Sequence, residues 1–346
     1  PQGDGGDLSF SVKVNVYGKS KASSGVESLV AKANPETLDY NNATTDQKNQ
    51  MWAFSHEATE QLAATTDYRY IGANPNNYVK FNDELWRIIG VFDVDDGTGK
   101  LKKRLKIIRS ELIGDYSWDN NSIATGAEDN YGKNNWPDAR LNYLLNGGHE
   151  SETYGGSLYW NRKSGTCYKG RYNATTSCDF TSTGLTDVAK EMIGDAKWYL
   201  GGTESFPASS NDLASDFFKN ERGITVYNGR STNWTGKVGL IYPSDYGYAT
   251  SGNSSTTRAT CLAKELYYWD RASACYQNDW LFKSSDMWSL SPSSYSYERV
   301  FLVSNIGHVS DNLAYSTYGV WPVVYLKSTI KVTSGTGSST DPFVLE

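Results

Sequence analysis

The sequence predicts an α+β fold with a mixed, mostly antiparallel sheet, two helices and very long loops. Three observations support this fold class. Short apolar runs of strand character recur along the chain, and only two segments of the later chain carry a helical spacing of apolar residues. In addition, 32 glycines and a mean hydropathy of −0.57 indicate many turns. The 346 residues are 38% hydrophobic and include 11 Trp and 25 Tyr, which is enough to build a core.

Residues 1–65 are expected to form an N-terminal extension, ahead of a domain over 66–346. Residues 8–16 alternate apolar and polar side chains at period two, from Leu8 to Val16, which predicts a strand. A helical part is expected over 45–65. The strand either joins the sheet of its own domain or complements a neighbouring subunit, as extended pilin segments do. The sequence leaves both alternatives open.

The domain begins with a predicted hairpin. Residues 81–94 and 101–113 are expected to be strands, joined by a turn at 95–99 that contains two glycines. Residues 236–242 are expected to form a buried strand that a turn at Pro243 follows. From Trp280 onward we expect short strands, ending in residues 320–332, and one more strand in the tail at 333–346.

Two helices are predicted, over 134–148 and 184–202. Asn135 is the expected N-cap of the first and Gly147 its stop, and Thr186 is the expected N-cap of the second. The long loops 115–134, 200–235 and 250–278 are expected to be functional, because structureless loops of that length are uncommon otherwise.

The tryptophans fall into two groups. Trp86, Trp136, Trp198, Trp280 and Trp288 lie beside apolar elements and are expected in the core. Trp118, Trp160, Trp234 and Trp269 lie in expected loops, where each either pins its loop to the core or stacks on a ligand.

The four cysteines form two local pairs, Cys167 with Cys178 and Cys261 with Cys275. Their even number and short spacing favour two disulfides that each close a polar loop. A four-cysteine zinc site and four buried free thiols are the alternatives. Disulfides would place the protein in an oxidising compartment, at the cell surface or outside the cell.

Composition argues against several classes of function. A net charge of −6 and a pI near 5.3 argue against a nucleic acid as partner. The chain has no run of 18 apolar residues, so we expect no transmembrane segment.

No motif for catalysis, metals or cofactors is found. Asp93 and Asp95 resemble the start of a calcium loop, but Thr98 and Arg104 stand where that loop needs Gly and Glu. The three histidines, His56, His149 and His308, are scattered outside any metal-binding spacing. We therefore expect a protein that is not an enzyme and uses no cofactor.

Residues 292–321 carry the most information about function. Twelve of these 30 residues are Ser, Tyr or Asn, and they alternate with apolar residues such as Val300 to Val303. Tyr supplies large contact area with few rotatable bonds, and Ser and Asn supply adaptable hydrogen bonds, as in an antibody paratope. This composition indicates a ligand-binding surface, with Tyr295, Tyr297, Tyr315 and Tyr318 as its anchors.

Several strings resemble a family of uncharacterised surface proteins from gut Firmicutes. The strings include TDYRYIGANPNNYVKFNDELWRIIGVF, WTGKVGLIYPSDYGYATSG, QNDWL, WSLSP and GVWPVVYLKS, and the resemblance covers roughly residues 50–345. Its order of elements is similar to the C-type lectin-like fold. Members of the family usually carry Arg where this chain has Trp321, which makes Trp321 an expected contact residue.

The same region resembles the variable cassette of target proteins of diversity-generating retroelements. That resemblance implies a fixed framework, Val300, Phe301, Val303, Gly307, Val309, Gly319 and Pro322, between variable positions. It implies ligand contacts at Ser293, Ser294, Tyr295, Tyr297, Ser304, Asn305, His308, Ser310, Asp311, Asn312, Tyr315, Ser316, Tyr318 and Trp321.

The expected function is therefore that of a bacterial adhesin or receptor-like protein, extracellular or on the cell surface. Its partner would be a protein or glycan ligand on another cell or on a phage or host surface. The sugar-binding motifs of calcium-dependent lectins are absent. A structural or filament subunit is the alternative. A less favoured one is an enzyme similar to formylglycine-generating enzymes, which share this fold class and would use Cys261 and Cys275.

Overall fold

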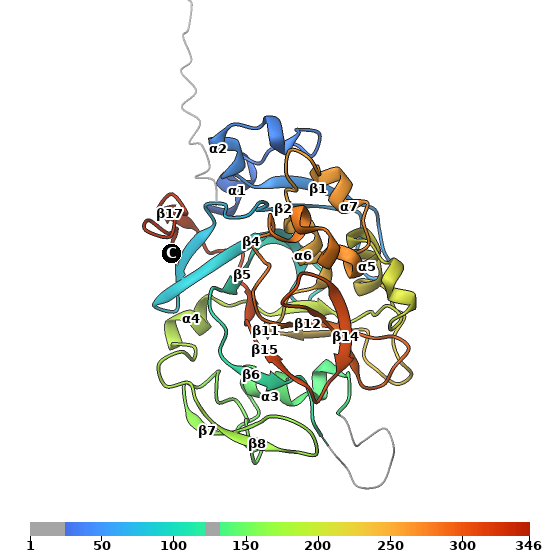
Figure 1. The fold of residues 1–346 in the computed structure, drawn as a ribbon. Helices are drawn as coiled ribbons and strands as arrows, with labels where there is room; N and C mark the ends of the chain where they lie inside the picture. Colours follow the sequence, from blue (N-terminus) through green and yellow to red (C-terminus); the bar gives the residue numbers. More distant parts are fainter. Residues whose placement is uncertain (1–24, 122–131) are drawn as a thin grey trace, which may run out of the picture.

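A computed structural model describes residues 25–121 and 132–346, and Figure 1 shows their arrangement. Two sheets of mainly antiparallel strands lie at the centre, and short helices and long loops surround them. The strand predicted over 8–16 lies outside the described residues, as do residues 122–131 of the predicted loop 115–134.

A seven-stranded antiparallel sheet extends from β1 and β2 in the upper part of the molecule to β11 at its centre in Figure 1. Its strand order is β1-β2-β4-β5-β16-β11, with β3 also paired to β4. The strands are β1 (Trp52–His56), β2 (Thr65–Arg69), β3 (Tyr78–Phe81), β4 (Glu84–Asp95), β5 (Leu101–Arg109), β11 (Val238–Gly239) and β16 (Val323–Tyr325). The division of the chain into an extension over 1–65 and a domain over 66–346 stays a prediction. Strand β1, which precedes residue 65, is hydrogen-bonded to β2 in this sheet.

The predicted hairpin is confirmed as β4 and β5, which pair antiparallel along their length. Asp95 Oδ1 accepts hydrogen bonds from the backbone N–H groups of Gly97 at 2.8 Å and Gly99 at 2.9 Å. Both glycines have positive φ, 91° and 77°, which a tight turn needs and which other residues rarely adopt. This carboxylate therefore holds the turn of the hairpin.

A five-stranded sheet follows, with the order β14-β13-β12-β15-β6. β12 and β15 pair in parallel, and the other pairs are antiparallel. The strands are β6 (Asp115–Ser117), β12 (Met287–Pro292), β13 (Arg299–Val303), β14 (Val309–Leu313) and β15 (Thr317–Gly319). The short strands predicted after Trp280 are thus confirmed.

Three two-stranded sheets complete the β structure of residues 25–121 and 132–346. They pair β7 (Ser164–Tyr168) with β8 (Thr175–Asp179), β9 (Ala196–Tyr199) with β10 (Asn233–Gly236), and β17 (Val332–Ser334) with β18 (Val344–Leu345). Antiparallel sheets with short helices confirm the α+β class.

The described residues contain eight short α-helical segments, where two longer helices were predicted. They are α1 (Gly25–Val30), α2 (Thr45–Lys48), α3 (Arg140–Leu145), α4 (Asp187–Met192), α5 (Ala214–Glu221), α6 (Pro243–Ala249), α7 (Arg258–Leu262) and α8 (Ser273–Tyr276). The 3-10 segments are η1 (Tyr40–Asn42), η3 (Trp136–Asp138), η4 (Ala208–Asn211) and η5 (Leu266–Arg271).

The prediction of a helix over 45–65 is confirmed only for α2 and is wrong for the residues after it. Residues 52–56 are β1, in which Trp52 and Phe54 are buried while Ser55 is exposed. This alternation, together with pairing to β2, outweighs the local helical propensity of the segment.

The helix predicted over 184–202 is confirmed only for α4. Thr186 is its N-cap, since its hydroxyl accepts a hydrogen bond from Ala189 N–H at 3.1 Å. The helix ends at Met192, and Ile193 is its C-cap in an extended conformation. At Gly194 an added Cβ would come within 2.5 Å of the Arg104 guanidinium. Residues 196–199 then form β9, in which Trp198 lies opposite Trp234.

The helix predicted over 134–148 is divided into η3 and α3. Asn135 precedes η3 but makes no capping bond; its side chain donates to Asp138 Oδ2 at 2.6 Å. Asn146 ends α3, one residue before the predicted stop.

The turn predicted at Pro243 is instead the start of helix α6. Pro243 occupies the first helical position, and the Asp245 carboxylate accepts a hydrogen bond from Tyr242 N–H at 2.9 Å. Both features are ordinary signals of a helix start. All seven residues of α6 are buried, and Gly247 lets the helix approach Ala214 of α5 closely.

The core contains most of the tryptophans. The five predicted there are all buried: Trp86, Trp136, Trp198, Trp280 and Trp288. Trp118 and Trp269 are buried too, which favours the pinning of their loops over contact with a ligand. Trp160 and Trp234 are half-buried.

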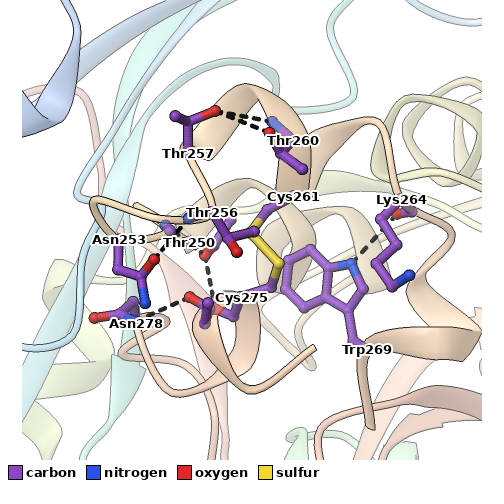
Figure 2. Close-up of a disulfide and its surroundings, with 12 residues drawn as sticks. Thr250, Asn253, Thr256, Thr257, Thr260, Cys261, Lys264, Trp269, Cys275 and Asn278 are labelled. Carbon is purple, nitrogen blue, oxygen red and sulfur yellow. Dashed lines mark hydrogen bonds between the residues drawn. A yellow bond between two sulfur atoms is a disulfide. The ribbon is translucent and has the colours of Figure 1, made fainter. Parts of the chain in front are cut away.

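Both predicted disulfides are present, Cys167–Cys178 and Cys261–Cys275, so the zinc and free-thiol alternatives are wrong. The first joins β7 to β8 and the second joins α7 to α8. Figure 2 shows the second disulfide beside the indole of Trp269, with the Thr250 hydroxyl donating to the Cys275 carbonyl at 2.7 Å.

Candidate functional site

Residues 292–321 build most of the five-stranded sheet and its connections. β14, at the right of the molecule in Figure 1, is an edge strand of this sheet. Because successive side chains of a strand point to opposite faces, Val309 and Asp311 are buried while Ser310 and Asn312 are half-exposed.

The predicted framework residues of this segment are buried. Val300, Phe301 and Val303 on β13 are each at most 1% exposed. Gly307 has a φ of 91°, and an added Cβ would meet the ring of Tyr276 at 2.4 Å. The turn between β13 and β14 therefore requires glycine at this position.

The predicted contact residues divide by exposure. Tyr295 is 76% exposed, the largest exposed fraction among the large hydrophobic side chains of the described residues. Ser294, Tyr297, Asn305, His308, Ser310, Asn312, Tyr315, Ser316 and Tyr318 are exposed or half-exposed. Ser293, Ser304, Asp311 and Trp321 are buried.

The two buried serines hold turns. The Ser293 hydroxyl lies 2.7 Å from the Ser205 hydroxyl and accepts hydrogen bonds from two backbone N–H groups of the loop that follows it. The Ser304 hydroxyl accepts hydrogen bonds from Ile306 N–H at 3.4 Å and His308 N–H at 3.2 Å. Both side chains therefore stabilise the backbone of the segment from its buried side.

Asp311 and Trp321 are also anchored inside. Asp311 Oδ2 lies 3.7 Å from an Arg299 nitrogen, and its Oδ1 accepts a hydrogen bond from Phe206 N–H at 3.4 Å. Trp321 is 4% exposed and packs close to Gly319. In this structure neither side chain forms part of the outer surface.

One flank of the segment is a stack of three rings. His308 stacks on Tyr267 of η5 with centroids 5.5 Å apart, and Tyr267 stacks on Phe206 at 4.9 Å. Phe206 is 51% exposed. The stack therefore continues the aromatic character of the segment beyond β14.

A second flank is the tip of the β7–β8 hairpin. The Arg171 guanidinium lies over the Tyr315 ring at 5.2 Å. Gly170 N–H donates to the Ser117 hydroxyl at 2.7 Å, which fixes the tip to β6.

A third flank is the loop around Arg230. Its guanidinium donates to the Tyr297 carbonyl at 3.1 Å and to Asn134 Oδ1 at 3.1 Å. The Asn134 amide in turn donates to three carbonyls of residues 293–299. Tyr227 packs against Tyr297 with ring centroids 6.0 Å apart. These contacts hold the Tyr295 loop in one conformation.

We call this combined face the aromatic surface. It comprises the exposed and half-exposed contact residues above together with Arg171, Phe206, Tyr227, Arg230 and Tyr267. Sequence reasoning did not identify these five flanking residues. Their only signal was their position in the long loops 200–235 and 250–278 and in the loop that the first disulfide closes.

The residues that define the aromatic surface include one histidine and no carboxylate. Burial lowers the pKa of His308, so its ring is neutral near pH 7. Burial raises the pKa of Glu298. Among the described residues, no group of three or more His, Cys, Asp or Glu could hold a metal ion.

The described residues contain a second notable cluster, which is ionic and buried. Arg69 donates to Asp67 and to Asp245, both at 2.9 Å, and Lys106 Nζ donates to Asp245. His56 Nε2 lies 3.2 Å from Asp67 Oδ2. A cavity of ≈ 10 Å³ borders Asp67, which leaves room for about one water molecule. The charged groups around Asp67 therefore have little free space beside them, while His56 also lines a larger cavity.

Glu221 and Arg222 form the other part of this ionic cluster. Arg222 donates to Glu221 at 3.0 Å, and Ser244 N–H donates to the same carboxylate at 3.0 Å. Burial raises the pKa of Glu221 to about 7, and Arg222 opposes this shift.

The raised pKa of Glu221 predicts a pH dependence of stability. The folded state binds this proton more tightly than the unfolded chain, so the contribution is complete below pH 4.5 and is lost as the pH rises through about 7. Glu221→Gln cannot ionise. We expect the wild type to lose about 1–3 kcal/mol of unfolding free energy relative to this variant between pH 4.5 and 8. Urea unfolding at several pH values measures the difference. If the unfolding free energies of the wild type and Glu221→Gln depend on pH in the same way, the raised pKa of Glu221 is contradicted.

Larger cavities lie elsewhere. One of ≈ 450 Å³ is lined by residues of α1, α2 and the tail, and one of ≈ 480 Å³ lies beside His56 and Phe218. None of the predicted contact residues lines either cavity.

Each disulfide supports one flank of the aromatic surface. Cys167–Cys178 closes the hairpin that carries Arg171, and Cys261–Cys275 closes the loop that carries Tyr267. We expect Cys261→Ser with Cys275→Ser to lower the unfolding free energy by about 2–4 kcal/mol. Chemical denaturation of the wild type and the variant measures this loss. Dithiothreitol should destabilise the wild type more than this variant, because only Cys167–Cys178 is left to reduce in the variant. A wild-type unfolding midpoint in the variant would contradict the role.

No family model, curated protein or solved structure matches this chain. Within the described residues, every helix is too short or too polar to cross a membrane.

Proposed function

We propose that this chain is a bacterial adhesin or receptor-like protein, secreted or on the cell surface, that binds its ligand through the aromatic surface. The observation that carries the proposal is the separation of residues 292–321 into a buried framework and an exposed set rich in Tyr, Ser and Asn. Large aromatic side chains dominate the binding energy of protein interfaces. Tyr295, Phe206 and Ile306, at 76%, 51% and 50% exposed, leave much apolar area open to a partner.

We further propose a C-type lectin-like scaffold whose contact residues are diversified by a retroelement. In support, ten of the fourteen side chains proposed to vary are exposed or half-exposed, while framework positions such as Phe301 are buried. A core of this kind tolerates changes at exposed positions, because surface substitutions seldom alter stability by more than about 0.5 kcal/mol.

The partner is proposed to be a protein or glycan ligand on another cell or on a phage or host surface. The net charge of −6 disfavours nucleic acid. Two disulfides suit an oxidising, extracellular compartment.

A binding role is preferred over catalysis for two reasons. Of the ionic cluster, His56 lines the ≈ 480 Å³ cavity, whereas Asp67, Arg69, Lys106 and Asp245 are not among the residues that line it. Cys261 and Cys275, the pair that a formylglycine-generating activity would use, are joined to each other beside Trp269. The filament alternative rests on residues 8–16, outside the described part of the chain.

The proposal is tested by removing two anchors together, Tyr295→Ala and Tyr315→Ala. The probes are intact bacterial cells, phage particles and a panel of immobilised glycans, each incubated with labelled wild type and variant. On any probe that binds the labelled wild type, we expect the amount of bound double variant to be lower by at least about tenfold. Loss of two tyrosines that act as hot spots has an effect of this size.

Tyr154→Ala is the matched control, because Tyr154 is 42% exposed and contacts Tyr168 beside β7 rather than residues 292–321. It should bind like the wild type. Equal retention of the wild type and the double variant would contradict the proposed function.

A further inference from the structure

Lys106 and Asp245 meet in the interior, where β5 faces the first turn of α6. Lys106 lies within β5, and Asp245 is the third residue of α6. Both side chains are 0% exposed, and Lys106 Nζ donates to Asp245 Oδ2. An ammonium group has three N–H donors, but among the described residues Asp245 is the one acceptor that Lys106 Nζ meets.

Aromatic rings surround the amine. The ring centroids of Tyr242, Tyr325, Phe92 and Trp198 lie 4.5, 5.4, 5.5 and 5.7 Å from Lys106 Nζ. Burial lowers the pKa of Lys106 to about 8. A neutral amine, which is the nucleophilic form of lysine, is therefore accessible near physiological pH.

We propose that Lys106 and Asp245 condense to an amide, so that β5 and α6 are crosslinked through their side chains. Lys106 Nζ first passes one proton to Asp245 Oδ2, to which it donates a hydrogen bond. The Nζ lone pair then attacks Cγ of Asp245, a second proton moves from the nitrogen to Oδ2, the Cγ–Oδ2 bond breaks, and Oδ2 leaves as water. Of the three hydrogens of the ammonium group, two leave on that water and one stays on the amide nitrogen. The reaction needs no oxidant, reductant or other reagent.

Hydrogen-bond donors on the carboxylate assist this step. Arg69 donates to Oδ1 at 2.9 Å, and Asp67 holds the same guanidinium from the other side at 2.9 Å. Oδ1 is the oxygen that stays in the amide, and negative charge builds up on it as the amine attacks. A fixed donor at this position stabilises that charge.

The remaining charges stay paired after the condensation. Loss of one cation and one anion leaves Arg69 with Asp67 and Arg222 with Glu221, at 2.9 and 3.0 Å. The ≈ 10 Å³ cavity, lined in part by Phe92 and Tyr325, can hold the water that is released. The neutral product also removes the unmet donors of a buried ammonium group.

The test is the mass of the intact full chain after reduction and denaturation, followed by peptide mapping. We expect a mass lower than that of the sequence by one water, and a branched peptide that joins the Lys106 and Asp245 segments. Trypsin should also fail to cut after Lys106.

Lys106→Arg removes the nucleophile but keeps the charge, and it should restore the full mass. Asp245→Asn condenses with loss of ammonia and should give the same product mass as the wild type. A wild-type chain at its full mass would overturn the proposal. So would a deficit that maps to the Asp96–Gly97 bond, where imide formation loses the same mass.

Discussion

Asp245→Ala is expected to lower the free energy of unfolding by about 3–5 kcal/mol, the usual cost of breaking a buried ion pair from one side. Asp245 accepts hydrogen bonds from Arg69 and Lys106, and all three side chains are at most 1% exposed. Its removal leaves two buried cations short of a partner and also removes the acceptor of Tyr242 N–H at the start of α6. With the proposed amide in place the loss is larger, because the variant also lacks a crosslink that restricts the unfolded chain.

Asp93→Ala is the matched control. Asp93 pairs with Lys103 on the same hairpin, but these side chains are 22% and 36% exposed. Solvent screens such a pair, and we expect a loss below about 1 kcal/mol. Denaturant unfolding of both variants gives the comparison. Equal losses would show that burial of the Asp245 cluster does not matter for stability.

Phe301→Ala is expected to cost about 3–5 kcal/mol, because it empties a fully buried site. Phe301 is 0% exposed and packs edge-to-face on Phe217 of α5, with ring centroids 5.3 Å apart. Tyr295 lies six residues earlier in the same segment and is 76% exposed. Tyr295→Ala should change stability by no more than about 0.5 kcal/mol.

Thermal or denaturant unfolding of the two variants tests the separation of framework from contact positions. A large loss for Tyr295→Ala would mean that this side chain supports the fold. A small loss for Phe301→Ala would mean that the proposed framework does not hold the segment.

The sequence predicted the elements that depend on local patterns. The β4–β5 hairpin follows from two apolar runs around a glycine turn, and the α4 start follows from Thr186 as N-cap. The disulfides follow from the spacing of the cysteines. In each case neighbours in sequence make the deciding contacts.

Two predictions of secondary structure were wrong where contacts between residues distant in sequence determine the structure. Residues 52–56 pair with β2 and residues 196–199 pair with β10, and neither pairing is visible in the local sequence. Helix α6 was missed although Pro243 and Asp245 are ordinary helix-start signals, since a proline after a strand was taken for a turn.

The candidate site shows the same limit. Alternation along the segment separated most contact positions from the framework, but it could not show that Trp321 turns inward. Nor could it show that Arg171, Phe206 and Tyr267 come from distant loops to flank Tyr315 and His308. Such contacts depend on tertiary packing of long loops.

The most direct test of the account is to sequence the coding segment for residues 292–321 from many isolates that carry this gene. We expect differences at the exposed and half-exposed contact positions, such as Tyr295, Asn312 and Tyr315, and at adenines of their codons. The codons of Val300, Phe301 and Val303 should stay constant. Differences spread evenly over framework and contact codons would contradict a diversified binding surface.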